Sequence, residues 1–237
     1  MAIQLAQLGD SLVNLTSSPV FSNARAAQSI SVWVNSNWGT IGTPVQSLVG
    51  MYAAGGGTAI QIGSRSAANC TVWTWGGGVL AAATGFTMLP DQWYHIAYTY
   101  DTTTHRVYIN GVLRGSSTAT QLAGNFNQVF INGYLGGGSN ETAAFHVDTY
   151  NYYTRTLTPD EIMTIYNTQG NRHGIIHGSL LRYEFDEGVV GEAIASIKNQ
   201  SDYDRSLSDL VAYTPAGASR ILFSPAYVAN NLRPPLI

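Results

Sequence analysis

The stretch WYHIAYTYDTTTHRVYINGVLR, residues 93–114, decides the fold, because it spells out an antiparallel meander with two turns. From residue 93 to residue 100 the chain alternates between two faces, with tyrosines and an isoleucine on one and His95, Ala97 and Thr99 on the other. This period of two is typical of a half-buried strand. Asn110-Gly111 then supplies the pair best suited to the positive φ angles of a type I′ hairpin. An antiparallel sheet is therefore predicted here.

Candidate strands recur about every ten residues around this meander, a spacing typical of all-β sandwiches and barrels. They cover residues 29–34, 47–53, 59–62, 70–75, 80–83, 127–132 and 144–153. Composition agrees, because charged residues make up only 11% of the chain and 25 glycines and 14 tyrosines favour turns and strands over helices. The one predicted helix begins at Thr158, where T-P-D-E provides an N-cap, a proline at the first position and Glu161 in the capping-box position.

The pattern W-x-H-x-A-x-x-Y-D followed by R-x-Y-x-N-G resembles the concanavalin A-like, laminin-G-like family of jelly-roll sandwiches. The match falls on Trp93, His95, Ala97, Tyr100, Asp101, Arg106, Tyr108, Asn110 and Gly111. A second block, residues 147–166, is similar to the closing strand and short helix of that family, and residues 30–34 are similar to an early strand. The resemblance covers residues 10–168 and implies an all-β, two-sheet antiparallel jelly-roll sandwich with one short helix.

The predicted sandwich occupies residues 1–170, and residues 171–237 form a C-terminal extension. Within the extension, residues 181–188 resemble the opening strand of the same family, although here that strand comes last. The segment either folds back to complete the sandwich, or extends to a partner, or begins a small second module. Its end, SPAYVANNLRPPLI, carries a Pro-Pro pair that offers few donors for a sheet.

Charge and hydropathy exclude several classes of function. The net charge is −3 and the ten arginines are spread singly, so no basic footprint for nucleic acid is present. No apolar run approaches the roughly 20 residues that span a bilayer, and the start, MAIQLAQLGDSL, lacks the features of a signal peptide. The single Cys70 excludes an intrachain disulfide and is expected to be a small buried residue and not a reactive thiol.

Two sets of residues are candidates for binding. Exposed aromatic rings beside amides suit a glycan, and Trp38 with Asn35 and Asn37, together with Trp75, offers that chemistry. Trp73 shares a strand face with Trp75, so both tryptophans have core packing as the alternative.

The resemblance also suggests a calcium site, because related laminin-G-like and pentraxin-like domains often bind calcium. Calcium takes six to eight oxygen ligands, and Asn140, Glu141 and Asp148 would contribute three. A dense D-x-D-x-D loop is absent, and the alternative for Asp148 is a strand cap or an arginine pair. Calcium is therefore the only cofactor that the sequence suggests.

Catalysis is not expected. Glu184 and Asp186 share a face of a predicted strand, as the carboxylates of glucanases in this class of sandwich do, but Gly188 and Val189 stand where a third acid would be needed. The histidines His173 and His177 have i, i+4 spacing without an H-E-x-x-H pattern, so loop positions are the better hypothesis.

These features together predict a non-enzymatic virion structural protein, namely a capsid decoration or cement protein or a head or tail fibre component of a phage or virus. Such a protein needs no export signal, and a charge-poor surface suits a homo-oligomer packed against capsid or other virion proteins. It would lie on the particle surface, where it could also bind a surface glycan; no nucleic-acid or membrane partner is expected. The alternative is an independent carbohydrate-binding, lectin-like module.

Overall fold

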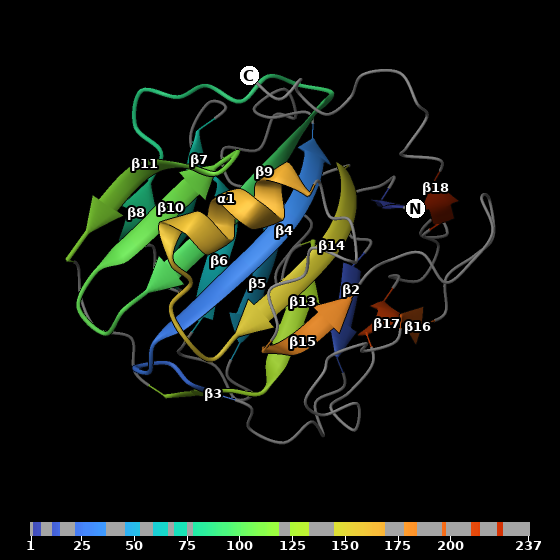
Figure 1. The fold of residues 1–237 in the computed structure, drawn as a ribbon. Coiled ribbons are helices and arrows are strands. Elements are labelled where there is room, and N and C mark those ends of the chain that lie inside the picture. The colour runs from blue at the N-terminus through green and yellow to red at the C-terminus, as the bar shows by residue number, and fades with distance from the viewer. Residues whose placement is uncertain are drawn as a thin grey trace.

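A computed structural model of the 237-residue chain shows two antiparallel sheets packed face to face, with one helix lying over the outer side of the first (Figure 1). The structure describes residues 2–5, 11–14, 22–36, 46–52, 59–65, 69–74, 78–118, 124–132, 145–168, 178–183, 196–197, 210–213 and 222–224. The sheet on the helix side is called the front sheet, and the other the back sheet.

The front sheet has the order β11-β10-β9-β4-β14-β1-β18, and β15 also pairs with β14. Its strands are β1 (Ala2–Leu5), β4 (Gln28–Ser36), β9 (Gln92–Tyr100), β10 (His105–Ile109), β11 (Val112–Ser117), β14 (Phe145–Tyr153), β15 (Ser179–Tyr183) and β18 (Leu222–Ser224). The predicted meander is confirmed as β9-β10-β11. Asn110 and Gly111 form its hairpin with φ angles of 52° and 79°.

The back sheet has the order β16-β17-β2-β13-β5-β6-β7-β8, and a short ladder of β12 and β3 stands apart from both sheets. The strands are β2 (Ser11–Asn14), β3 (Ser22–Asn23), β5 (Gln46–Tyr52), β6 (Ala59–Ser64), β7 (Cys70–Trp73), β8 (Val79–Ala82), β12 (Asn125–Phe126), β13 (Gln128–Ile131), β16 (Ser196–Ile197) and β17 (Leu210–Tyr213). Each run predicted from the sequence overlaps a strand, so the prediction of a two-sheet antiparallel sandwich is confirmed.

Strands from the C-terminal segment join both sheets. β15 pairs with β14, β17 pairs with β2, and β18 pairs with β1. The described strands after residue 170 therefore extend the sheets that the earlier strands form. The division of the chain into residues 1–170 and 171–237 stays a prediction.

The core lies between the sheets and is filled by alternate residues of both. Val32 and Ile96 of the front sheet belong to it, as do Val49, Ile62 and Val72 of the back sheet. All five side chains are fully buried. Cys70 lies in the same core, and burial raises the pKa of its thiol to about 12, as expected of a packing residue and not of a nucleophile.

The prediction that residues 93–100 form a half-buried strand was wrong, because every residue from 93 to 100 in β9 is buried. The reason is α1 (Pro159–Asn167), which lies across the outer face of the front sheet (Figure 1). A second apolar cluster fills the space beneath α1 and consists of Ala97, Tyr108, Tyr153, Leu157, Ile162 and Ile165. Beside it the ring of Tyr166 stacks on Trp33, with centroids 5.8 Å apart. The helix therefore gives the front sheet a second buried face.

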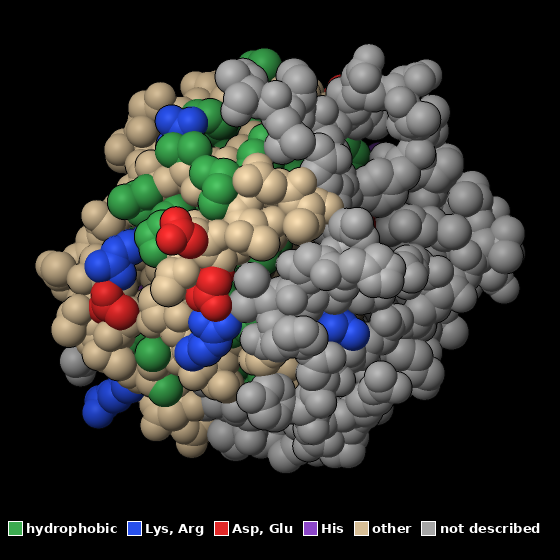
Figure 2. Space-filling view, viewed as in Figure 1, with side chains coloured by type: hydrophobic (Ala, Val, Ile, Leu, Met, Phe, Trp, Pro, Cys, Tyr) green, Lys and Arg blue, Asp and Glu red, His purple; other side chains and the backbone are tan. Residues whose placement is uncertain are grey.

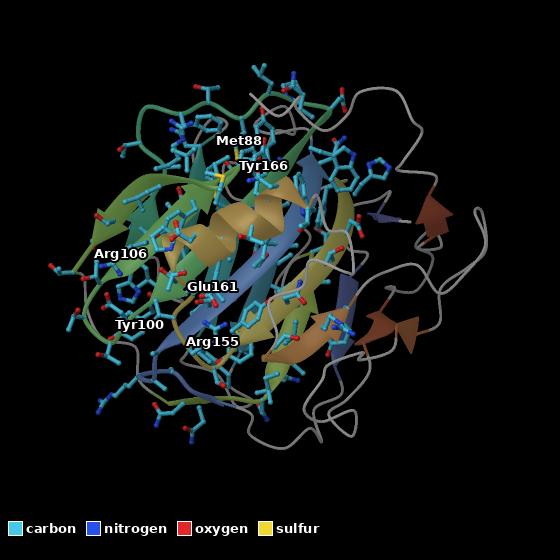
Figure 3. The ribbon with its side chains drawn as sticks, viewed as in Figure 1. Met88, Tyr100, Arg106, Arg155, Glu161 and Tyr166 are labelled. Atoms are coloured by element: carbon cyan, nitrogen blue, oxygen red, sulfur yellow. The ribbon has the colours of Figure 1, made fainter. Side chains whose placement is uncertain are left out.

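The start of α1 is fixed by the hydrogen bonds that its sequence predicts. Thr158 accepts from the backbone N–H of Glu161, and the Glu161 carboxylate accepts from the backbone N–H of Thr158, so the capping box is confirmed. The Arg155 guanidinium donates to both carboxylate oxygens of Glu161, at 2.9 and 2.7 Å, and the two side chains lie together in Figure 3. Ser29 of β4 ties this turn to the sheet, because its hydroxyl accepts from the Leu157 N–H.

Two opposite-sign ion pairs lie on the helix side of the molecule. Figure 2 shows acidic and basic side chains next to one another on this face. These pairs are Arg155 with Glu161 and Arg106 with Asp101. Within the described part of the chain, no helix is long and apolar enough to cross a membrane.

Candidate functional site

Most of the residues proposed from the sequence as ligands lie outside the described residues. These are Asn37, Trp38, Trp75, Asn140 and Glu141, and the same holds for Glu184, Asp186, His173 and His177. Asn35 and Asp148 are described. The roles assigned to all of them stay predictions.

Asn35 and Asp148 lie near each other on the outer face of the front sheet. Asn35 of β4 pairs with His146 of β14, and Asp148 pairs with Trp33 two residues further along. Both are buried, with 7% and 4% of their surfaces exposed, and the Thr149 hydroxyl donates to Asp148 at 3.1 Å. Among the described residues, no group of three or more His, Cys, Asp or Glu side chains is placed to hold a metal ion.

The strands that carry Asn35 and Asp148 pair up to the last residue of one and the first residue of the other. Ser36, the last residue of β4, pairs with Phe145, the first residue of β14. Beside this point His146 is half-buried, and burial lowers the pKa of its imidazole while the nearby Asp91 carboxylate raises it.

Ser31 and His95 form a hydrogen-bonded pair that resembles a nucleophile with its base, since the hydroxyl lies 2.9 Å from Nε2 of the imidazole. Both side chains are buried. The rings of Trp33 and Tyr166 flank the imidazole, with centroids at 5.3 and 6.2 Å. Since α1 covers the pair, its role is packing and hydrogen bonding.

The outer face of the back sheet carries a different set of side chains. In β5, β6, β7 and β13, every second residue points into the core, so the residues between them point outward. We call five of these residues the aromatic-amide face: Tyr52, Gln61, Trp73, Gln128 and Phe130. Within the described residues, none of its three aromatic rings belongs to a hydrophobic core cluster.

The strand register brings these five side chains into two rows. Phe130, Gly50, Gln61 and Trp73 are paired in turn across β13, β5, β6 and β7, and Tyr52 pairs with Gln128 in the next row. The Tyr52 and Phe130 rings meet edge to face, with centroids 6.1 Å apart. Gly50 makes room for this arrangement, because a Cβ there would lie 2.6 Å from Cζ of Phe130.

Gln61 leaves hydrogen-bonding capacity on this face. Its side chain is 1% exposed, and among the described residues its Nε2 has no hydrogen-bond partner. A buried amide N–H without a partner costs about 1–3 kcal/mol. The group can therefore donate to an oxygen atom of a ligand only if the atoms that now bury Gln61 move aside.

All five residues of the face are buried, with 1–9% of their surfaces exposed, and an exposed side chain borders the face only at β8 among the pairings described here. Val79 of β8 pairs with Trp73 and keeps 46% of its surface exposed. Arg65 is half-buried and holds its guanidinium carbon 6.0 Å from the centroid of the Trp73 ring.

Sequence reasoning found only part of this face. The sequence indicates Trp73 only as a neighbour of Trp75 on one strand face, and it does not single out Gln61. The signal for Gln61 is present in A-I-Q-I-G, where one amide interrupts the apolar residues of a predicted strand and so marks its opposite face.

A closed core between two antiparallel sheets, a helix over one outer face and an aromatic-amide face on the other define a lectin-like jelly-roll sandwich. A model of the concanavalin A-like lectin/glucanases superfamily matches residues 8–163. The chain belongs to that superfamily, which confirms the resemblance seen in the sequence. No curated protein matches the chain.

Solved structures of other proteins share the fold. A protein from Bacteroides ovatus proposed to bind carbohydrate is similar with a TM-score of 0.59 and 14% identity, over 92% of this chain. This chain covers 60% of the length of that protein. A likeness at this identity shows the fold alone.

Looser similarities extend to two further proteins. The binding domain of botulinum neurotoxin serotype G has a TM-score of 0.48 and 16% identity, with 67% of this chain and 40% of that one covered. The sialidase of Trypanosoma rangeli has a TM-score of 0.47 and 20% identity, with 62% and 23% covered. At these scores neither adds to the argument.

Proposed function

We propose that this protein is a carbohydrate-binding module and that its ligand contacts the aromatic-amide face of the back sheet. The superfamily and the similarity to the Bacteroides ovatus protein support binding of this class. The observation that carries the location is Nε2 of Gln61, which has no hydrogen-bond partner among the described residues and belongs to the register partner of Trp73.

The chemistry of the face suits a sugar. A pyranose ring presents apolar C–H surfaces that pack on aromatic rings, and hydroxyl oxygens that pair with amides. Trp73, Phe130 and Tyr52 supply rings, while Gln61 and Gln128 supply amides that both donate and accept. A saccharide oxygen at Nε2 of Gln61 would remove the cost of its unpaired N–H.

The test is a screen on a glycan array, followed by calorimetry of any glycan retained, for the wild type and Gln61→Met. Methionine keeps the length of the side chain and removes the donor, so we expect affinity to fall about tenfold. Gln46→Met is the matched control, because Gln46 is equally buried and its amide also lacks a partner among the described residues. Gln46 pairs with Ser64, on the core side of the same sheet.

The two variants give the proposal a clear way to fail. If wild type, Gln61→Met and Gln46→Met bind a glycan equally, the face is not its site. If no glycan in a broad library binds the folded wild type, the proposed function is wrong.

The hypothesis of a virion structural protein rests on sequence features, namely the lectin-like resemblance, the lack of a signal-peptide pattern and the charge-poor composition, and no contact among the described residues adds to it. It keeps its own test, which is light scattering of the full chain after size-exclusion chromatography. A defined homo-oligomer that binds no glycan would favour it over the module. Catalysis is not part of the proposal, and hydrolysis lost in Glu184→Ala would contradict us on that point.

A further inference from the structure

We infer that this chain forms a two-fold homodimer through an apolar surface made by β11 and the loop between β8 and β9. This surface is called the hairpin-loop patch, and its members are Phe86, Leu89, Asp91, Val112, Leu113 and Arg114. The inference is independent of the proposed function, because a glycan-binding module can be a monomer or a dimer. It follows from where the exposed apolar side chains lie and from the two charges beside them.

Large apolar side chains that are exposed gather in one part of the described chain. The exposed ones are Val79, Leu89, Val112 and Leu113, and each keeps 43–50% of its surface exposed. Three of these four belong to the hairpin-loop patch, whereas Val79 pairs with Trp73 in the back sheet. Figure 2 shows hydrophobic side chains gathered between α1 and the β11 edge. Exposed apolar side chains that lie together, and not singly, are typical of an interaction surface.

Contacts between β11 and the loop join the members of the patch. Arg114 of β11 holds its guanidinium carbon 4.6 Å from the centroid of the Phe86 ring. The Phe86 ring meets the Tyr94 ring edge to face at 6.0 Å, and the backbone N–H of Leu89 donates to the Tyr94 hydroxyl. The patch therefore runs from β11 through the Phe86 ring to Leu89.

The outer side of β11 is open to a second molecule. β11 is the terminal strand of the front sheet, and no described strand pairs with its outer side. Its register with β10 shifts between Val107 and Tyr108, so Arg114 is an extra residue of β11 at a bulge. A bulge disfavours direct pairing with another strand. The dimer is therefore expected to be held by side chains and not by a continuous sheet.

The two charges of the patch lie at its opposite ends. Arg114 is at the β11 end, and Asp91 is exposed at the other end, where the loop enters β9. Among the described residues, neither Arg114 nor Asp91 belongs to an ion pair. The patch thus carries one positive and one negative end with apolar side chains between them.

This arrangement is self-complementary, and that property favours a second copy of the chain as the partner. In a two-fold dimer, a residue i of one copy contacts residue j of the other, and residue j contacts residue i. Arg114 of each copy would then meet the partner's Asp91, while Leu89 and Val112 would pack between these two ion pairs. A partner of a single charge sign would satisfy only one end of the patch.

The experiment measures the dimer dissociation constant of the full chain by analytical ultracentrifugation, at protein concentrations from about 0.1 to 100 µM. We expect a dimer within that range. Leu89→Ser should raise the dissociation constant at least about tenfold, because the dimer buries this side chain in both copies. Arg114→Glu and Asp91→Arg should each raise it about tenfold. The double variant should return it to within about threefold of the wild type, because the exchange restores both ion pairs.

Val79→Ser and Arg25→Glu are the matched controls, since one residue is an exposed valine and the other an exposed arginine outside the patch. Both should leave the dissociation constant unchanged. Thermal melts establish that each variant is folded. If Arg114→Glu does not fold, Leu89→Ser and Asp91→Arg still decide, because both of these residues are exposed.

Three outcomes would overturn the inference. The first is a monomer at every concentration, and the second is a dimer that Leu89→Ser weakens no more than Val79→Ser does. The third is a double charge variant that folds but does not restore the dimer, because Arg114 and Asp91 then do not meet across the two-fold axis. Glycan binding by the same protein tests the proposed function separately.

Discussion

Truncation of Ile162 to alanine tests whether α1 is a structural part of the sandwich. Ile162 is fully buried beneath the helix, against a cluster that includes Ala97 and Tyr108 of the front sheet. Loss of a large aliphatic side chain at such a site costs about 2–5 kcal/mol, from lost burial and from the cavity left behind. The position of α1 is fixed at its start by the capping box and by Arg155, so the helix has little freedom to collapse into the gap. We therefore expect a loss of about 3 kcal/mol.

The assay is urea unfolding at neutral pH, followed by tryptophan fluorescence and far-UV circular dichroism. In a domain of this size, a loss of 1 kcal/mol lowers the melting temperature by roughly 2–4 °C, so Ile162→Ala should melt about 6–12 °C lower. Thr164→Ala is the control on the same helix. Thr164 is exposed, and its replacement should change the free energy of unfolding by less than about 0.5 kcal/mol.

A small effect would refute the reasoning. If Ile162→Ala loses less than about 1 kcal/mol, the burial beneath α1 does not stabilise the fold as a packed core does. In that case α1 would lie over the front sheet without packing tightly against it. If both variants lose the same amount, the effect belongs to the helix itself and not to the contact with Ala97 and Tyr108.

Three further results are expected. Arg155 lowers the pKa of Glu161 below its ordinary 4.5, so this pair stabilises the fold above about pH 4.5 and the contribution is lost as pH falls through the lowered value; Glu161→Gln should flatten that part of an acid-unfolding curve. The Cys70 thiol, with its pKa raised to about 12, should react with a disulfide reagent only after unfolding, and rapid reaction of the native protein would contradict its burial. Gly115→Ala should destabilise the protein by about 2 kcal/mol in the same urea assay, because a Cβ there would lie 1.8 Å from the carbonyl oxygen of Ala82; an unchanged midpoint would refute that contact.

Local patterns in the sequence determined the parts of the fold that could be predicted. The alternation of residues 93–100 and the Asn110-Gly111 turn identify the meander, and T-P-D-E identifies the start of α1, since each signal lies within a few residues. The burial of both faces of β9 could not be predicted in this way. It depends on α1, which lies about sixty residues later and contributes the side chains that cover Ala97.

The candidate site depends on non-local pairing to a greater degree. A tryptophan in a strand is visible in the sequence, but its neighbours are set by the register of β5, β6 and β7. Gln61 and Trp73 are twelve residues apart and become adjacent only when β6 and β7 pair. Arg65 belongs to the site because its guanidinium lies over the Trp73 ring. No periodic pattern in the sequence predicts that contact.

An unpartnered amide does not locate a site by itself, and three buried glutamines of this chain show why. Gln28 in the front sheet is satisfied, because its Nε2 donates to the Ala24 carbonyl and its Oε1 accepts from Tyr152. Gln46 and Gln61 both leave Nε2 without a partner among the described residues, at similar cost. Their surroundings differ: Gln46 faces the core side of its sheet, whereas Gln61 is paired with a tryptophan that carries an arginine above it. For Gln46, the donor without a partner is therefore a local imperfection of packing. For Gln61, the same donor lies beside an aromatic ring and a cation, a combination that suits a saccharide.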